Sequence, residues 1–117
     1  MAAPNIVNVA TITGKTVGAA LTTSSADIVT NSASSNKVFK VNALYVANID
    51  GTNAADITVD LFRSSTAYRI ASTISVPADS TLDVISKAIY LEEGDALRCT
   101  ASANSDLEAV CSYEEIS

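Results

Sequence analysis

The sequence predicts an all-β protein, an antiparallel β-sandwich of about eight short strands in a jelly-roll-like arrangement. Apolar and polar residues alternate with a period of two along most of the chain after Lys37, and no segment sustains the 3.6-residue apolar period of a helix. Charged residues make up only 17% of the chain, while β-branched residues, which pack well on a pleated sheet, are abundant. Turn signals separate the alternating segments at intervals of roughly 8–12 residues.

The first third of the chain has the weakest pattern. The segments TVGAALTT (16–23) and ADIVTN (26–31) predict two shorter strands, and residues 1–14 are expected to form an extended N-terminal arm. Before Lys37 the only charged residues are Lys15 and Asp27. A segment with so few charges is poorly suited to be exposed to water, so we expect it to be covered by the rest of the chain or by a neighbouring subunit. Within it, residues 1–21 are expected to contribute to contacts between subunits or between a subunit and the shell.

The central segments alternate more clearly. KVFKVNALYVANI (37–49) predicts one long strand, and Asp50–Gly51 marks the turn after it. DITVDLFR (56–63) and YRIASTISV (68–76) predict the next two strands, with Pro77 in the following turn; TLDVIS and AIYL predict short strands. The residues expected to share a face within each of the three longer strands are Phe39, Val41, Ala43, Tyr45, Ala47 and Ile49; Ile57, Val59 and Leu61; and Tyr68, Ile70, Ile74 and Val76. The other face of the first strand turns apolar at Leu44 and Val46, so we expect this strand to be covered on both faces toward its end.

The last two segments, ALRCTA (96–101) and LEAVCSY (107–113), predict a hairpin closed by the polar NSD. Cys99 and Cys111 would then face one another across the two strands. A disulfide between the two cysteines is then geometrically possible. Because synthesis in the cytosol favours thiols, we expect two buried free thiols. Two cysteines alone do not complete a tetrahedral zinc site.

Length and charge restrict the function. A chain of 117 residues without internal repeats or linkers predicts a single domain over 1–117. The net charge is −6 and no Lys/Arg cluster interrupts it, which argues against nucleic-acid binding. There is no apolar run long enough to span a bilayer and no secretory leader pattern, so we expect synthesis in the cytoplasm and no membrane partner.

Candidate chemical motifs are weak. Histidine is absent, which excludes Ser-His-Asp and Cys-His catalysis. GKT (14–16) resembles the end of a phosphate-binding loop, but Val9 stands where that motif needs glycine. The loop DGTNAAD supplies Asp50, Asn53 and Asp56 as oxygen ligands, yet it lacks the regular spacing and the closing glutamate of a calcium loop, and a solvated loop is the favoured interpretation.

The most concentrated group of acids is in LEEGDAL (91–97), where Glu92, Glu93 and Asp95 surround Gly94. A glycosidase pair needs two carboxylates from separate elements across a cleft, which neighbours on one turn do not provide. Glycine supplies a positive φ and aspartate can bind nearby backbone N–H groups, so the segment predicts a hairpin turn. We therefore assign no catalytic, cofactor-binding or metal-binding residue.

Three segments carry a family resemblance: KVNALYVANIDGTNAADITVDLFRSS (40–65), ASTISVPADSTLDVISK (71–87) and IYLEEGDALRCTASA (89–103). In this order, with the terminal CSYEEIS, they resemble small virion structural proteins of tailed phages, particularly marine cyanophages. The resemblance implies a β-sandwich component of the virion and brings no catalytic motif or cofactor with it.

The resulting expectation is a non-enzymatic capsid decoration or a neck or tail accessory subunit. Its partners would be other virion proteins and further copies of itself, with a trimer implied by the resemblance. The alternative is a receptor- or glycan-binding tail module. Aromatic residues are scarce, with four Tyr, two Phe and no Trp, so Tyr45, Tyr68 and Tyr90 are the residues left to build a sugar platform.

Overall fold

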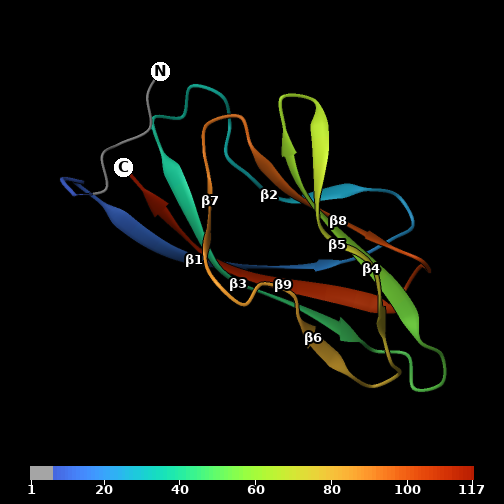
Figure 1. Ribbon diagram of the computed structural model, residues 1–117. Coiled ribbons are helices and arrows are strands. Elements are labelled where there is room, and N and C mark those ends of the chain that lie inside the picture. The colour runs from blue at the N-terminus through green and yellow to red at the C-terminus, as the bar shows by residue number, and fades with distance from the viewer. Residues whose placement is uncertain (1–6) are drawn as a thin grey trace.

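The computed structural model describes residues 7–117, which form two antiparallel sheets packed face to face (Figure 1). The strands are β1 (Ile12–Ala20), β2 (Ala26–Thr30), β3 (Val38–Asn48), β4 (Ala55–Arg63), β5 (Thr66–Val76), β6 (Thr81–Asp83), β7 (Ile89–Leu91), β8 (Ala96–Ala101) and β9 (Leu107–Ile116). Sheet A has the order β1-β9-β3-β6, with β7 also paired to β3, and sheet B has the order β2-β8-β4-β5. The predicted β-sandwich is confirmed, with nine strands rather than about eight.

The core lies between the sheets and is built from one face of each long strand. Leu97 and Cys99 point inward from β8, and Leu107, Ala109 and Cys111 point inward from β9. All five are buried, as their period of two predicts. Burial of such side chains contributes roughly 25 cal/mol for each Å² of apolar surface removed from water, so these alternating strands supply much of the driving force for folding.

The predicted hairpin between these two strands is wrong. β8 lies in sheet B and β9 in sheet A, so residues 102–106 cross from one layer to the other. Each strand has one apolar face, and that face packs against the opposite layer whether the two strands are neighbours in one sheet or lie in different sheets, so the alternation does not distinguish the two cases. The choice depends on distant strands: β8 pairs with β2 and β4, and β9 pairs with β1 and β3.

The predicted face of β3 is correct only as far as Val41. The pairing of β3 with β9 shifts between Val41 and Ala43, which is a β-bulge. One extra residue reverses the alternation beyond it. Leu44 and Val46 are therefore fully buried, as expected, whereas Tyr45 on the opposite face, which was also expected to be covered, is 44% exposed.

The predicted apolar face of β5 is buried only at Val76. Tyr68, Ile70 and Ile74 remain between 38% and 55% exposed. β5 is the edge strand of sheet B, and its pairing with β4 shifts twice, so its alternation is not continuous along the strand. In β4 the expected inner residues Ile57 and Val59 are fully buried, and Leu61 is partly buried against the core.

The N-terminal segments form the two predicted strands. β1 starts at Ile12 and pairs with β9 along its whole length, so residues 12–14 belong to sheet A rather than to an arm. Residues 1–6 of the expected arm lie outside the described residues. The two ends of the described chain meet where Thr11 and Ser117 exchange N–H···O=C bonds of 3.0 and 2.9 Å. No helix that could cross a membrane is found in residues 7–117.

Candidate functional site

The acidic segment LEEGDAL forms the link between β7 in sheet A and β8 in sheet B. The N–H of Asp95 donates to the carbonyl of Glu92 at 3.0 Å, and Gly94 has a φ of +88°. This places glycine at the third position of the turn, where type II geometry requires a positive φ. The predicted glycine-dependent turn is confirmed, but it is not a hairpin, because β7 and β8 belong to different sheets.

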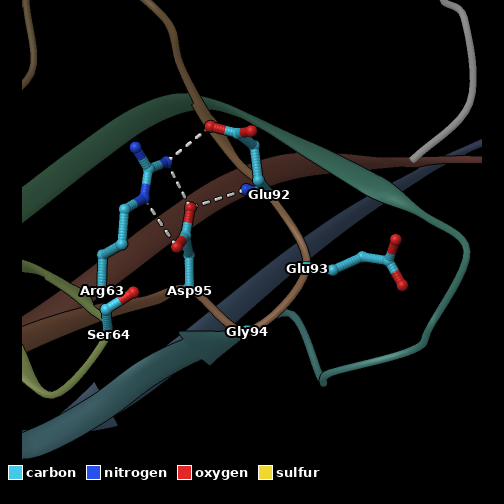
Figure 2. A pocket seen from close by; sticks show the side chains of 6 residues that line it. All are labelled: Arg63, Ser64, Glu92, Glu93, Gly94 and Asp95. Carbon is cyan, nitrogen blue, oxygen red and sulfur yellow. Dashed lines mark hydrogen bonds and ion pairs between the residues drawn. The ribbon is translucent and has the colours of Figure 1, made fainter. Parts of the chain in front are cut away.

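Arg63, at the end of β4, binds two of the three carboxylates of this turn (Figure 2). Its Nε donates to Asp95 Oδ1 at 2.8 Å and its Nη2 to Asp95 Oδ2 at 2.5 Å, a bidentate pair, while Nη2 also lies 2.8 Å from Glu92 Oε2. The hydrogen bonds to Asp95 are the main reason that the pKa of Arg63 is raised above its usual value. The Asp95 side chain is only 3% exposed, so the guanidinium compensates a buried charge.

Asp95 also fixes the backbone of its own turn. The N–H of Glu92 donates to Asp95 Oδ2 at 2.8 Å, so one carboxylate joins the start of the turn to its end (Figure 2). Arg63 and Asp95 together connect sheet B to the crossing between the sheets. The acid was noted in the sequence, but its arginine partner was not, because 32 residues separate the two.

Asn31 holds the same turn from the other side. Its N–H donates to the carbonyl of Asp95 at 2.9 Å, and its own carbonyl accepts from the N–H of Gly94 at 2.8 Å. Its buried side-chain amide donates to the carbonyls of Lys37 and Leu91 at 2.9 and 3.0 Å. No pattern in the sequence indicates this role, since an asparagine after a strand is equally typical of an ordinary loop.

Glu93 is separate from the other two acids. Figure 2 shows its side chain directed away from the Arg63 cluster. Its Oε2 accepts a hydrogen bond of 3.1 Å from the N–H of Asn36, and its Oε1 is buried without a hydrogen-bond partner within the described part of the chain. The three carboxylates thus do not converge on one point.

An open hollow of about 350 Å³ lies over the turn. It is lined by Arg63, Ser64, Glu92, Glu93, Gly94 and Asp95. Glu92 and Asp95 bind the same guanidinium and do not flank a space for a sugar ring, as a glycosidase pair would. Each of these hydrogen bonds holds a backbone segment or compensates a charge, which is a structural role.

The other motifs singled out in the sequence are dispersed. Gly14, Lys15 and Thr16 lie inside β1, where Lys15 Nζ is 2.9 Å from Glu115 Oε2. Asp50 Oδ1 accepts from the N–H groups of Thr52 and Asn53 at 2.8 and 3.3 Å, and these backbone hydrogen bonds lower the pKa of Asp50. Over residues 7–117 no three acidic, cysteine or histidine side chains are grouped so that they could hold a metal ion.

The tyrosines proposed for a sugar platform do not lie together. Tyr45 is on β3 and Tyr90 on β7, both in sheet A, whereas Tyr68 is on β5 in sheet B. All three are more than 40% exposed.

The two cysteines are buried free thiols that lie in opposite sheets, so they do not face one another along a hairpin. Burial raises the pKa of Cys99 to about 12 and that of Cys111 to about 11.

A row of alternating charges crosses sheet B and was not foreseen. Asp27, Arg98, Asp60 and Arg69 are neighbours across β2, β8, β4 and β5. Arg98 Nε donates to Asp27 Oδ1 at 2.7 Å, and Arg69 Nη1 donates to both oxygens of Asp60 at 2.6 and 2.7 Å. Arg98 also lies 3.7 Å above the centre of the Phe62 ring. The residues are up to 71 positions apart, so only the strand order brings them together.

Comparison with known proteins gives likeness in structure but not in sequence. No protein-family model matches the chain, and no curated protein is significantly similar to it in sequence. A chain from the disulfide-linked pili of Bacillus endospore appendages superposes with a TM-score of 0.55 at 14% identity, covering 92% of this chain and 87% of that one. A chain from the acid-stable capsid of the Helicobacter pylori bacteriophage KHP30 superposes with a TM-score of 0.54 at 5% identity, covering 94% and 90%. At such low identity these likenesses show a common fold, a β-sandwich that spans nearly the whole of each chain.

Proposed function

We propose that the protein is a non-enzymatic structural subunit of a phage virion, which assembles through contacts with copies of itself and with other virion proteins. The observation that carries the proposal is the likeness, over nearly the entire chain, to a sandwich in a phage capsid and to a second one in a pilus. Both of those proteins belong to repetitive assemblies, in which weak contacts are multiplied by avidity.

The charged groups of this chain support the same role. Five of the seven cations form ion pairs with carboxylates of the same chain: Lys15, Lys37, Arg63, Arg69 and Arg98. Charged side chains that hold strands and turns together serve the rigidity of a building block rather than catalysis. Within the virion, we propose that the protein is a capsid decoration subunit or a neck or tail accessory subunit. The phage would be a tailed marine phage, because the sequence resembles virion proteins of such phages.

The experiment that tests this proposal locates the chain in particles. Virions purified from a phage that encodes the chain are imaged by electron microscopy, and their protein content is measured by mass spectrometry. We expect the chain in a fixed copy number, with density for its two-layered sandwich on the head, neck or tail. If the chain is abundant in the lysate but absent from purified particles, the proposal is wrong.

The exposed Tyr45 and Tyr90 on sheet A keep one alternative, a glycan- or receptor-binding tail module. That alternative requires saturable binding of the isolated protein to host cells or to their surface glycans, lost in a Tyr45→Ala/Tyr90→Ala variant. A structural subunit has no such requirement, so binding assays with the purified protein separate the two.

The role expected for residues 1–21 in subunit contact cannot be tested by deleting them. Such a deletion removes β1 and Leu21, whose side chain is only 1% exposed, and therefore damages the core. Variants that keep β1 folded are needed. The trimer implied by the sequence resemblance would be one closed form of self-assembly.

A further inference from the structure

The edges of the two sheets differ in how well they are protected against pairing with another chain. An exposed edge strand offers unpaired N–H and C=O groups, and natural proteins guard such edges with short strands, charges or bulges. β2 has five residues and a register shift, β6 and β7 have three residues each, and β5 has two register shifts and carries Arg69. β1 is the least protected: it runs for nine residues without a register shift, and its only charged residue, Lys15, is paired with Glu115 of the neighbouring β9.

The free edge of β1 can be defined residue by residue. Thr11 and Ser117 exchange both of their hydrogen bonds, and the N–H of Leu21 donates to the carbonyl of Leu107. In an antiparallel pair such bonded positions alternate, so the odd-numbered residues of β1 bind β9. The residues that direct their N–H and C=O groups away from β9 are Ile12, Gly14, Thr16, Gly18 and Ala20. All five are exposed, and no strand formed by residues 7–117 pairs with this edge.

We propose that β1 pairs antiparallel with β1 of a second copy of this chain, with the two-fold axis at Thr16. In this register Thr16 lies opposite Thr16, Gly14 opposite Gly18, and Ile12 opposite Ala20 of the second copy. Every outward-directed backbone group of one strand then meets an outward-directed group of the other, and the two copies of sheet A become one continuous sheet. The contact is isologous, because the same patch is used by both copies.

The side chains and charges of β1 favour a second copy as its partner. A net charge of −6 opposes self-association in general, but β1 contains no carboxylate. Its one cation, Lys15, binds Glu115 at 2.9 Å and would lie opposite Val17 of the second copy, so no like charges face each other. The opposed glycines allow close approach of the backbones, and the half-exposed Ile12 gains an apolar neighbour.

This inference rests on the proposed self-assembly of the subunit and specifies its contact. An isologous contact closes as a dimer, so the mass expected in solution is twice the 12.1 kDa of one chain rather than the mass of a trimer.

A charge-swap experiment tests both the partner and the register. The wild-type chain should form a dimer at about 100 µM and dissociate on dilution, as followed by sedimentation equilibrium. Thr16→Lys places two lysines opposite each other, and Thr16→Glu two glutamates, so each variant alone should dimerise at least about tenfold more weakly. An equimolar mixture of the two variants should form a heterodimer again. Because Thr16 is exposed, both variants should keep the far-UV circular dichroism of the wild type.

A backbone variant supplies the matched control. Thr16→Pro removes an N–H that points to the free edge, so the fold should persist but the dimer should be lost; Thr16→Val keeps the N–H and should keep the dimer. Hydrogen exchange at Gly14, Thr16 and Gly18 should be slow at high concentration and fast on dilution. A wild-type chain that stays monomeric at about 100 µM, forms a trimer, or dimerises equally well as Thr16→Pro overturns the inference. A dimer with these properties in a protein absent from virions would instead overturn the proposed function and leave this contact standing.

Discussion

At the scale of single residues, one turn depends on three side chains from distant parts of the chain. Asp95 supplies a buried carboxylate, Arg63 neutralises it from the end of β4, and Asn31 binds the turn through its backbone and its amide. Removing one partner of such a group leaves a buried polar atom unpaired, which costs about 1–3 kcal/mol. The turn is therefore stabilised by Asp95 with its partners Arg63 and Asn31 and by the conformation of Gly94. The exposed Glu92 contributes less.

Substitutions in this turn should separate conformation from charge. Gly94 has a φ of +88°, and a Cβ added there would meet no atom within 4 Å, so the cost of a side chain is conformational rather than steric. Gly94→Val should lower the free energy of unfolding by about 1–3 kcal/mol, and Gly94→Asn by less, because asparagine tolerates positive φ. Glu92→Gln combined with Glu93→Gln should change it by less than about 1 kcal/mol, since Glu92 is 65% exposed.

Thermal unfolding followed by circular dichroism checks this order of stabilities, at roughly 3–6 °C per kcal/mol for a chain of this size. If the double glutamine variant were damaged and Gly94→Val were not, the acids rather than the glycine would carry the turn, and a functional acidic site would return as the better interpretation.

At the scale of elements, the sequence predicts the position of most strands and the face of some of them. In β4, β8 and β9 apolar and polar residues alternate according to which face of the strand is buried. The inner positions of Val59, Leu97 and Leu107 were therefore predicted correctly. The alternation could not reveal the bulge between Val41 and Ala43, because Asn42 fits the polar face of a regular strand as well as it fits a bulge. Nor could it show that residues 102–106 change sheets, because that choice depends on strands more than 30 residues away.

Three elements meet at Glu115, and their connection should depend on pH. Lys15 of β1 and Lys37 before β3 both bind this carboxylate of β9, at 2.9 and 3.0 Å, and the hydrogen bond to Lys15 is the main cause of the lowered pKa of Glu115. A carboxyl group whose pKa is lower in the folded state stabilises the fold above its unfolded pKa of about 4.3, and this contribution is lost as the pH falls through the folded value.

Glu115→Gln should therefore reduce the loss of stability on acidification from about pH 6 to pH 3. Urea unfolding at a series of pH values measures this loss of unfolding free energy. Glu114→Gln is the control, because Glu114 has no ion pair among the described residues. The interpretation fails if Glu115→Gln and wild type lose stability in parallel, or if Glu114→Gln has the larger effect.

At the scale of the whole molecule, the two layers are held together by a shared apolar interior and by connections that cross between them. β8 and β9 are consecutive in sequence yet lie in different sheets, and so do β7 and β8. Local segments therefore cannot form the core by themselves, and neighbours far apart in sequence must meet first, which is typical of all-β proteins that fold in milliseconds to seconds. The thiols in this interior lie one in each layer and can report on its opening.

Thiol labelling should therefore measure the stability of the entire sandwich. Cys99 and Cys111 are buried, and their pKa values of about 12 and 11 leave almost no thiolate at pH 8, so a disulfide reagent should not react promptly with the folded protein. In denaturant without reductant both cysteines should react. Labelling should accelerate in Gly94→Val but not in the Glu92→Gln/Glu93→Gln variant, because reaction follows the population of the open state. Prompt labelling of the native chain would show that one layer opens independently of the other, and an unreactive denatured chain would show that the two layers are joined by a disulfide.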